Sequence, residues 1–174
     1  VIQDGCLMVG TKQRVAEIFA KNEIEAQEKK TGIKVKTLIY TGSWNGFGPV
    51  ATAFAAYRLG LKSNVYLSSV GAGQSEITPL KKMMKNKQIN ILLALNSNIF
   101  LCESYRKAKD TSFDCAYGLN NNNDQYVIPM GLNDDKHVMV NLLAKQIKIA
   151  TKGTILGNTL EPRIWVVAGS GGIL

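Results

Sequence analysis

The chain has 174 residues, of which 45% are hydrophobic and 20% are charged, a profile that indicates one ordinary globular domain and excludes a disordered chain. No apolar stretch approaches the length of a membrane span. The formal net charge of +8 comes from scattered lysines rather than an arginine cluster, so we expect a solvated surface, with no membrane and no specific nucleic acid as partner.

The first third of the chain predicts a helix, a strand and a second helix. An amphipathic pattern over 11–31 predicts a helix that ends at Gly32. The β-branched residues of 34–40 predict a strand. A glycine-rich loop follows, and Pro49 then stands at the first position of an alanine-rich helix that ends at Gly60.

The middle of the chain continues this alternation. Residues 63–69 predict a strand, and 80–87 predict a helix that a Thr-Pro pair begins. The apolar run over 89–95 has the length of a buried parallel strand. Residues 96–110 read as a helix cap followed by a helix. Residues 111–125 contain four consecutive asparagines and are expected to be irregular.

The last part of the chain predicts a short strand at 126–132, a helix at 135–153 and a final strand at 164–168. Strands and helices therefore alternate almost throughout. That order is typical of a mainly parallel sheet with helices on both faces, which is an α/β fold of three αβα layers.

Cysteine and histidine usage limits the chemistry that the chain can carry. The three cysteines, Cys6, Cys102 and Cys115, are odd in number and show no CxxC spacing, so neither a disulfide framework nor a zinc site is indicated. Free thiols favour a reducing compartment, and we expect a cytoplasmic protein without a bound metal. His137 is the only histidine, and a surface position at a helix start is the simplest interpretation of it.

Two loops early in the chain contain residues suited to binding or catalysis, and ligands of open α/β sheets bind at the carboxyl ends of strands. In "VGTKQR", Lys12 begins a helix, where burial and the positive helix terminus would lower its pKa and make the amine reactive. The alternative is a solvated lysine. "TGSWNGFGP" offers hydroxyls at Thr41 and Ser43 and an amide at Asn45. The alternative is a plain glycine-rich turn.

A third candidate loop stands at the end of the chain. In "WVVAGSGG" a buried strand runs into the small residues Gly169, Ser170, Gly171 and Gly172, whose backbone N–H groups could hold a phosphate. A nucleotide or methyl-donor loop is a further alternative, although such loops usually follow the first strand of a Rossmann-like domain.

Taken in this order, the three loops resemble those of the fold type II (tryptophan synthase β-like) pyridoxal-phosphate-dependent enzymes. The nearest branch is that of 1-aminocyclopropane-1-carboxylate deaminase and D-cysteine desulfhydrase, in which a "GGTK-x-R" motif carries the Schiff-base lysine. "VGTKQR" is similar to it, which implies that role for Lys12. The resemblance also implies that Ser43 and Asn45 contact the cofactor ring, and that the phosphate is held by Gly169, Ser170, Gly171 and Gly172.

The resemblance implies a pyridoxal-phosphate-dependent lyase, deaminase or desulfhydrase that acts on a small amino acid through a Lys12 Schiff base. It also implies a homodimer, and further sequence on both sides of this chain. Residues 1–174 would then be one partial unit, with a possible smaller subdomain at about 49–125. The alternative is a non-catalytic structural or assembly protein that retains the fold, which the departure of Gln3-Asp4 from the family's "RED" pattern favours.

Overall fold

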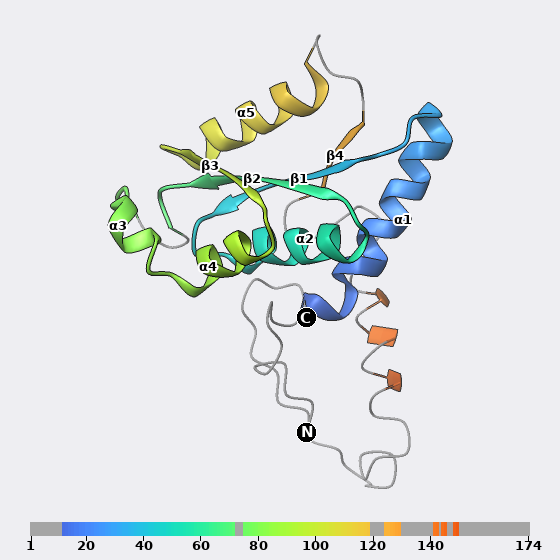
Figure 1. Cartoon of the computed structure of the whole chain (residues 1–174), viewed down its shortest axis with the longest axis horizontal. Helices are drawn as coiled ribbons and strands as arrows, with labels where there is room; N and C mark the ends of the chain where they lie inside the picture. Colours follow the sequence, from blue (N-terminus) through green and yellow to red (C-terminus); the bar gives the residue numbers. More distant parts are fainter. Residues whose placement is uncertain are drawn as a thin grey trace, which may run out of the picture.

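The computed structural model describes residues 12–71, 75–118, 124–129, 141–142, 144–145 and 148–149. Helices and strands alternate along most of these residues (Figure 1). In chain order the elements are α1 (Gln13–Thr31), β1 (Thr37–Ser43), α2 (Phe47–Arg58), β2 (Lys62–Ser68), α3 (Leu80–Met83), α4 (Lys87–Ala94), β3 (Asn98–Cys102), α5 (Tyr105–Tyr117) and β4 (Gln125–Val127).

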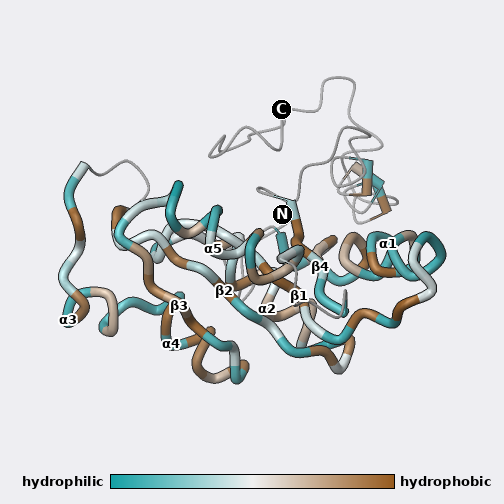
Figure 2. Tube along the Cα trace, turned by 90° about the horizontal axis from the view of Figure 1, so that it is seen from above, coloured by the Kyte–Doolittle hydropathy of each residue, from teal (hydrophilic) through white to brown (hydrophobic). Residues whose placement is uncertain are grey.

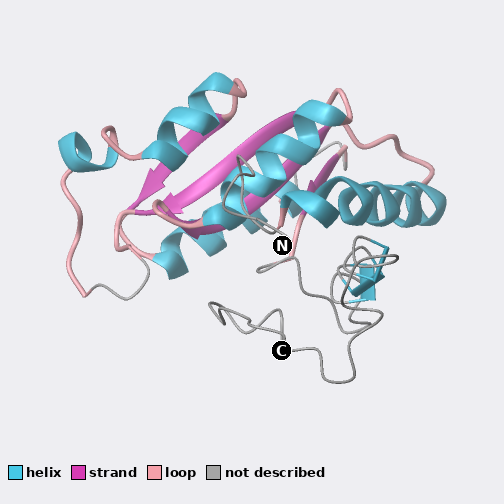
Figure 3. Ribbon diagram, turned by 90° about the horizontal axis from the view of Figure 1, so that it is seen from below, coloured by secondary structure: helices cyan, strands magenta, loops and turns pink. Residues whose placement is uncertain are grey.

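The strands form one parallel sheet in the order β3-β2-β1-β4. All four strands run in the same direction, so their carboxyl ends meet at one edge of the sheet (Figure 3). Helix α5 covers one face, and α1, α2 and α4 lie on the other (Figure 1). The predicted α/β fold of three layers with a parallel sheet is therefore confirmed for the described part of the chain.

The main core lies between the sheet and the α1, α2 and α4 layer. Phe19 of α1, Leu38 of β1, Val50 of α2 and Leu67 of β2 are all fully buried in it. Burying one side chain of this size contributes about 1.5–3 kcal/mol. Figure 2 shows the matching pattern in α1, where hydrophobic and hydrophilic residues alternate around the helix. None of the helices among the described residues is both long and apolar enough to cross a membrane.

The structure corrects the prediction for the stretch from 87 to 102. The run at 89–95, predicted as a strand, lies in helix α4, and the strand β3 follows within 96–110, where a helix was expected. The Asn86 side chain caps α4 by accepting from the Gln88 N–H at 2.8 Å. An apolar run of this length is compatible with a buried strand or a buried helix. Here the N-cap interaction of Asn86 favours the helix.

A second correction concerns α5. Residues 111–117 were expected to be irregular, but they continue this helix to Tyr117. The helix begins because the Ser104 side chain accepts from the Lys107 N–H at 3.2 Å, a favourable N-cap interaction. Its face toward the sheet carries the fully buried Ala108 and Ala116.

The remaining expectations differ in their bounds. Helix α1 ends at Gly32, whose φ of 71° suits glycine, as predicted. Strand β1 lies three residues later than the predicted 34–40, and the helical segment predicted at 80–87 reduces to the four residues of α3 before α4 begins. Strand β4 lies at the predicted short strand, whereas 164–168 fall outside the described residues.

Candidate functional site

The loop after β1 forms a tight turn at the carboxyl edge of the sheet. The Gly46 N–H donates to the Ser43 carbonyl at 3.0 Å, which closes the turn. The Trp44 N–H donates to the carbonyl of Ser68, the last residue of β2, at 3.3 Å. The turn is therefore attached to two neighbouring strands, and its position follows from the sheet.

Close packing behind the turn explains the glycines on either side of it. A Cβ on Gly48 would lie 2.2 Å from the Tyr40 Oη atom, and a Cβ on Gly42 would lie 3.1 Å from the Tyr40 ring and from Pro49. The Tyr40 ring is 4% exposed, so it fills the space that side chains at these positions would need. The first turn of α2 can therefore approach β1 directly, which aligns the helix terminus with the strand end.

The start of α2 offers backbone donors at this edge. The helix begins at Phe47, two residues before the predicted Pro49, and its N-cap Gly46 provides no side-chain cap. N–H groups in the first turn have no acceptor within the helix, and Phe47 and Gly48 supply such groups while Pro49 has none. Their N–H groups and the positive end of the helix dipole favour an anionic ligand.

Both polar residues predicted for this loop lie in the turn. Ser43 ends β1, Asn45 occupies the turn, and each is half-buried, so a ligand could reach either side chain. Thr41, the other hydroxyl of the loop, is buried and donates to the Ser112 hydroxyl of α5 at 2.8 Å. Thr41 thus joins β1 to α5 and faces away from the α2 side of the sheet.

Trp44 was not among the predicted site residues. Its side chain is 5% exposed and belongs to the main core. The indole Nε1 atom is buried and has no hydrogen-bond partner among the described residues. Leaving a buried N–H unpaired costs about 1–3 kcal/mol. The tryptophan inside a glycine-rich loop is the one sequence signal that could have indicated this donor.

Lys12 occupies the N-cap of α1, and its carbonyl accepts from the N–H groups of Val15 and Ala16. Its side chain is half-buried, and burial lowers the pKa of the ammonium below its ordinary value of 10.5. This is the direction predicted for a reactive amine, because a lower pKa leaves more of the neutral form near pH 7.

Helix α1 lies beside α2 and is joined to its far end. Glu17 pairs with Arg58, in the last turn of α2, at 3.2 Å. Ser43 and Asn45, in contrast, precede the first turn of α2. The structure thus brings the two loop residues together and places Lys12 on a separate, adjacent helix. The shared site of Lys12 with this turn stays a prediction, and Gly169, Ser170, Gly171 and Gly172 lie outside the described residues.

A second cluster of titratable groups lies under α5. The Tyr66 ring stacks on Phe100 of β3 with 4.6 Å between ring centroids, and its hydroxyl lies close to the Cys115 thiol. Burial, then Cys115, raises the pKa of Tyr66 well above its ordinary value, so this phenol stays neutral. Cys102 and Cys115 are free thiols, as predicted. Among the described residues no group of His, Cys, Asp or Glu could hold a metal ion.

No family model matches the chain, and no curated protein matches it either. The structure is similar to a cysteine synthase from Entamoeba histolytica, with a TM-score of 0.49 and 18% identity over 82% of this chain and 37% of that one. It is also similar to two crystal structures of diaminopropionate ammonia lyase from Escherichia coli, an apo form and a selenomethionine-incorporated holo form. Each has a TM-score of 0.42 and 13% identity over 82% of this chain, covering 39% and 36% of those chains.

The chain therefore spans less than two-fifths of the length of each of these three solved structures. None of the three is a deaminase of 1-aminocyclopropane-1-carboxylate or a desulfhydrase of D-cysteine, so the assignment to that branch stays a prediction.

Proposed function

We propose that Lys12 and the Ser43–Gly46 turn belong to a pyridoxal 5'-phosphate site, and that the chain is the cofactor-binding part of an enzyme acting on a small amino acid. A deaminase, a desulfhydrase or another lyase fits this description. The observation that carries the proposal is the turn itself, which lies at the carboxyl edge of a parallel sheet and leads into the first turn of a helix, whose N–H groups have no acceptor within the helix. The sequence motifs predict a cofactor loop at this turn.

The groups around the turn suit the proposed cofactor chemically. The Ser43 hydroxyl, the Asn45 amide and the N–H groups of Phe47 and Gly48 can all donate hydrogen bonds. A set composed of donors fits an anionic oxygen, such as the ring oxygen of the cofactor or the carboxylate of an amino acid.

Bound pyridoxal phosphate would supply an electron sink that stabilises negative charge on the carbon beside the substrate amine. The residues of this chain would hold and activate the reactants. Lys12 would hold the cofactor through its Nζ amine and could carry a proton at that atom. Asn45 and Ser43 would orient the ring, and Gly169–Gly172 would hold the phosphate.

Titration of the full chain with pyridoxal phosphate, followed by visible absorption, tests this proposal. We expect the wild type to develop a visible band and Lys12→Ala to lose it. Asn45→Ala should keep the band but bind about tenfold more weakly, because about 1.4 kcal/mol of hydrogen bonding is lost. Lys21→Ala is the matched control, since Lys21 is an exposed lysine of the same helix that pairs only loosely with Glu25 at 3.9 Å.

Two outcomes would contradict the assignment. If Lys12→Ala and Lys21→Ala lose equal parts of the band, the cofactor is reacting with surface lysines. If no variant shows a band, including the wild type, the alternative of a non-catalytic protein that retains the fold is favoured.

A further inference from the structure

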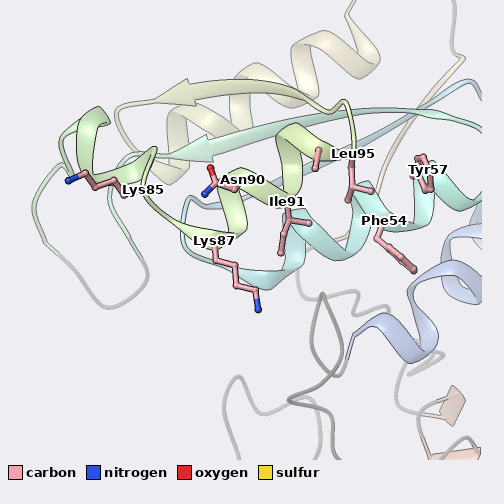
Figure 4. Close-up of a pocket in the computed structure, with 8 residues that line it drawn as sticks. Phe54, Tyr57, Lys85, Lys87, Asn90, Ile91 and Leu95 are labelled. Atoms are coloured by element: carbon pink, nitrogen blue, oxygen red, sulfur yellow. The ribbon is translucent and has the colours of Figure 1, made fainter.

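A groove of about 680 Å³ lies between helices α2 and α4. Its apolar lining comes from Phe54 and Tyr57 of α2, from Ile91 of α4 and from Leu95, the C-cap residue of α4, and Figure 4 shows these side chains. Tyr57 is 63% exposed, whereas the other three are half-buried against the main core. The groove is separate from the Ser43–Gly46 turn, which precedes the opposite end of α2.

The groove is basic as well as apolar. Lys85 and Lys87 line it where α3 passes into α4, and both are exposed (Figure 4). Neither forms an ion pair with any described residue. Residues 77–102 contain four lysines and no aspartate or glutamate. The positive charge at this end of the groove therefore has no carboxylate nearby in the sequence to neutralise it, and an acidic ligand would be attracted to it.

We propose that the α2–α4 groove binds an amphipathic helix of a partner protein, with apolar side chains toward the groove and carboxylates toward Lys85 and Lys87. Lys87 and Ile91 of α4 and its C-cap Leu95 are spaced at four-residue intervals, so they form one ridge. Phe54 and Tyr57 form the opposing ridge on α2. A third helix can place its own side chains between two such ridges, which is how helices dock in grooves.

The length of the groove sets the size of the ligand. Helix α4 has eight residues and α2 has twelve, which correspond to roughly 12 and 18 Å. A partner helix of two to three turns would fill this length.

The charge and packing of the groove favour a protein partner over a membrane or a second copy. Ile89 and Leu92 of α4 are buried in the core, so only part of the apolar surface of this helix, such as the half-exposed Leu93, could face a bilayer. A second copy docked groove to groove would bring the Lys85 and Lys87 side chains of both copies together, where their like charges repel. An acidic helix is instead attracted to the same surface.

A labelled synthetic helix provides the test. The probe is an acidic amphipathic peptide of about 16 residues, long enough to form helix, with leucines at i, i+3, i+4 and i+7 and glutamates on both flanks. Its binding to the full chain is measured by fluorescence anisotropy at low and physiological salt. A peptide with lysine in place of every glutamate is the control ligand. We expect saturable binding of the acidic peptide that weakens with salt, and none of the basic one.

Charge reversal locates the binding surface. Lys85→Glu combined with Lys87→Glu should weaken binding at least about tenfold, since two attractive contacts become repulsive. The matched control combines Lys81→Glu with Lys82→Glu, which changes the net charge equally but affects two lysines of α3 outside the groove lining. Equal weakening by both pairs would overturn the proposal, because it would show only non-specific attraction.

An apolar position gives an independent readout. Tyr57→Glu in the groove should weaken binding by a similar factor, whereas Tyr117→Glu, on the exposed face of α5 across the sheet, should leave it unchanged. Both tyrosines are at least half exposed, so neither change is expected to unfold the protein. If Tyr117→Glu weakens binding more than Tyr57→Glu does, the assignment of binding to the α2–α4 groove is contradicted.

Two alternative occupants have outcomes of their own. Sedimentation with vesicles of anionic phosphatidylglycerol that depends on Lys85 and Lys87 more than on Lys81 and Lys82 would assign the surface to a membrane and overturn the proposal. Self-association of the chain in analytical ultracentrifugation, abolished by Tyr57→Glu, would assign it to a second copy and would also overturn it.

Discussion

Gly48→Ala is expected to destabilise the protein even though alanine favours helices. Helix propensity alone would stabilise the variant by about 1 kcal/mol. The added methyl carbon would lie 2.2 Å from the Tyr40 Oη atom and 2.5 Å from its Cζ atom, whereas non-bonded carbons in contact stand about 3.5–4.0 Å apart. Tyr40 is 4% exposed and its ring has little room to move. Overpacking of this kind costs about 1–3 kcal/mol, and a contact this short falls in the upper part of that range, so we expect a net loss of about 1–2 kcal/mol.

Urea unfolding followed by circular dichroism measures this loss as a lower midpoint with an unchanged slope. A double-mutant cycle with Tyr40→Leu identifies the cause. Leucine removes the hydroxyl and the end of the ring, so Gly48→Ala should be less harmful in that background than in the wild type. If Gly48→Ala alone is as stable as the wild type or more stable, the packing of α2 on Tyr40 described here is wrong.

Three further predictions follow from single contacts and titrations. Because burial lowers the pKa of Lys12, its ammonium form weakens folding at pH 7, and stability should rise with pH toward its ordinary pKa of 10.5. Lys12→Met should therefore unfold at a higher temperature than the wild type at pH 7, and this difference in unfolding temperature should shrink by pH 10. A difference that stays constant with pH would exclude the buried charge of Lys12 as its cause. Ser112→Ala leaves the Thr41 hydroxyl without its acceptor and should cost about 1–2 kcal/mol in urea unfolding, whereas Thr41→Val should cost less, because Ser112 still donates to the Lys109 carbonyl at 2.7 Å. Burial raises the pKa of the Cys102 thiol, so it should react with iodoacetamide at pH 8 more slowly than free cysteine, and an equal rate would contradict its placement.

Much of the fold could be predicted from local signals in the sequence. The left-handed positions Gly32 and Gly60, with φ of 71° and 69°, end or follow helices where glycine was expected. The alternation of helices and strands was sufficient to predict the parallel sheet. The bounds of α4 and β3 were not predictable in this way, because the apolar run before Asn96 is as long as a buried strand, and only the Asn86 cap and the left-handed Asn96 distinguish the helix.

Part of the candidate site was also predictable from local signals in the sequence. Ser43 and Asn45 lie in a local motif between a strand and a helix, so their proximity follows from the sequence. The contact of Tyr40 with Gly48 and the unpaired indole of Trp44 depend on how α2 packs on the sheet. The position of Lys12 relative to the turn also depends on tertiary packing, which no spacing in the sequence determines.

The most direct test of the central claim is to find which lysine bonds the cofactor. The full chain is mixed with an equal amount of pyridoxal phosphate, reduced with borohydride, digested and mapped by mass spectrometry. The proposed site predicts that Lys12 carries most of the label, and that Asn45→Ala lowers the labelling of Lys12 without changing that of Lys21. Label spread evenly over the exposed lysines, or equal total labelling of Lys12→Ala and the wild type, would contradict it.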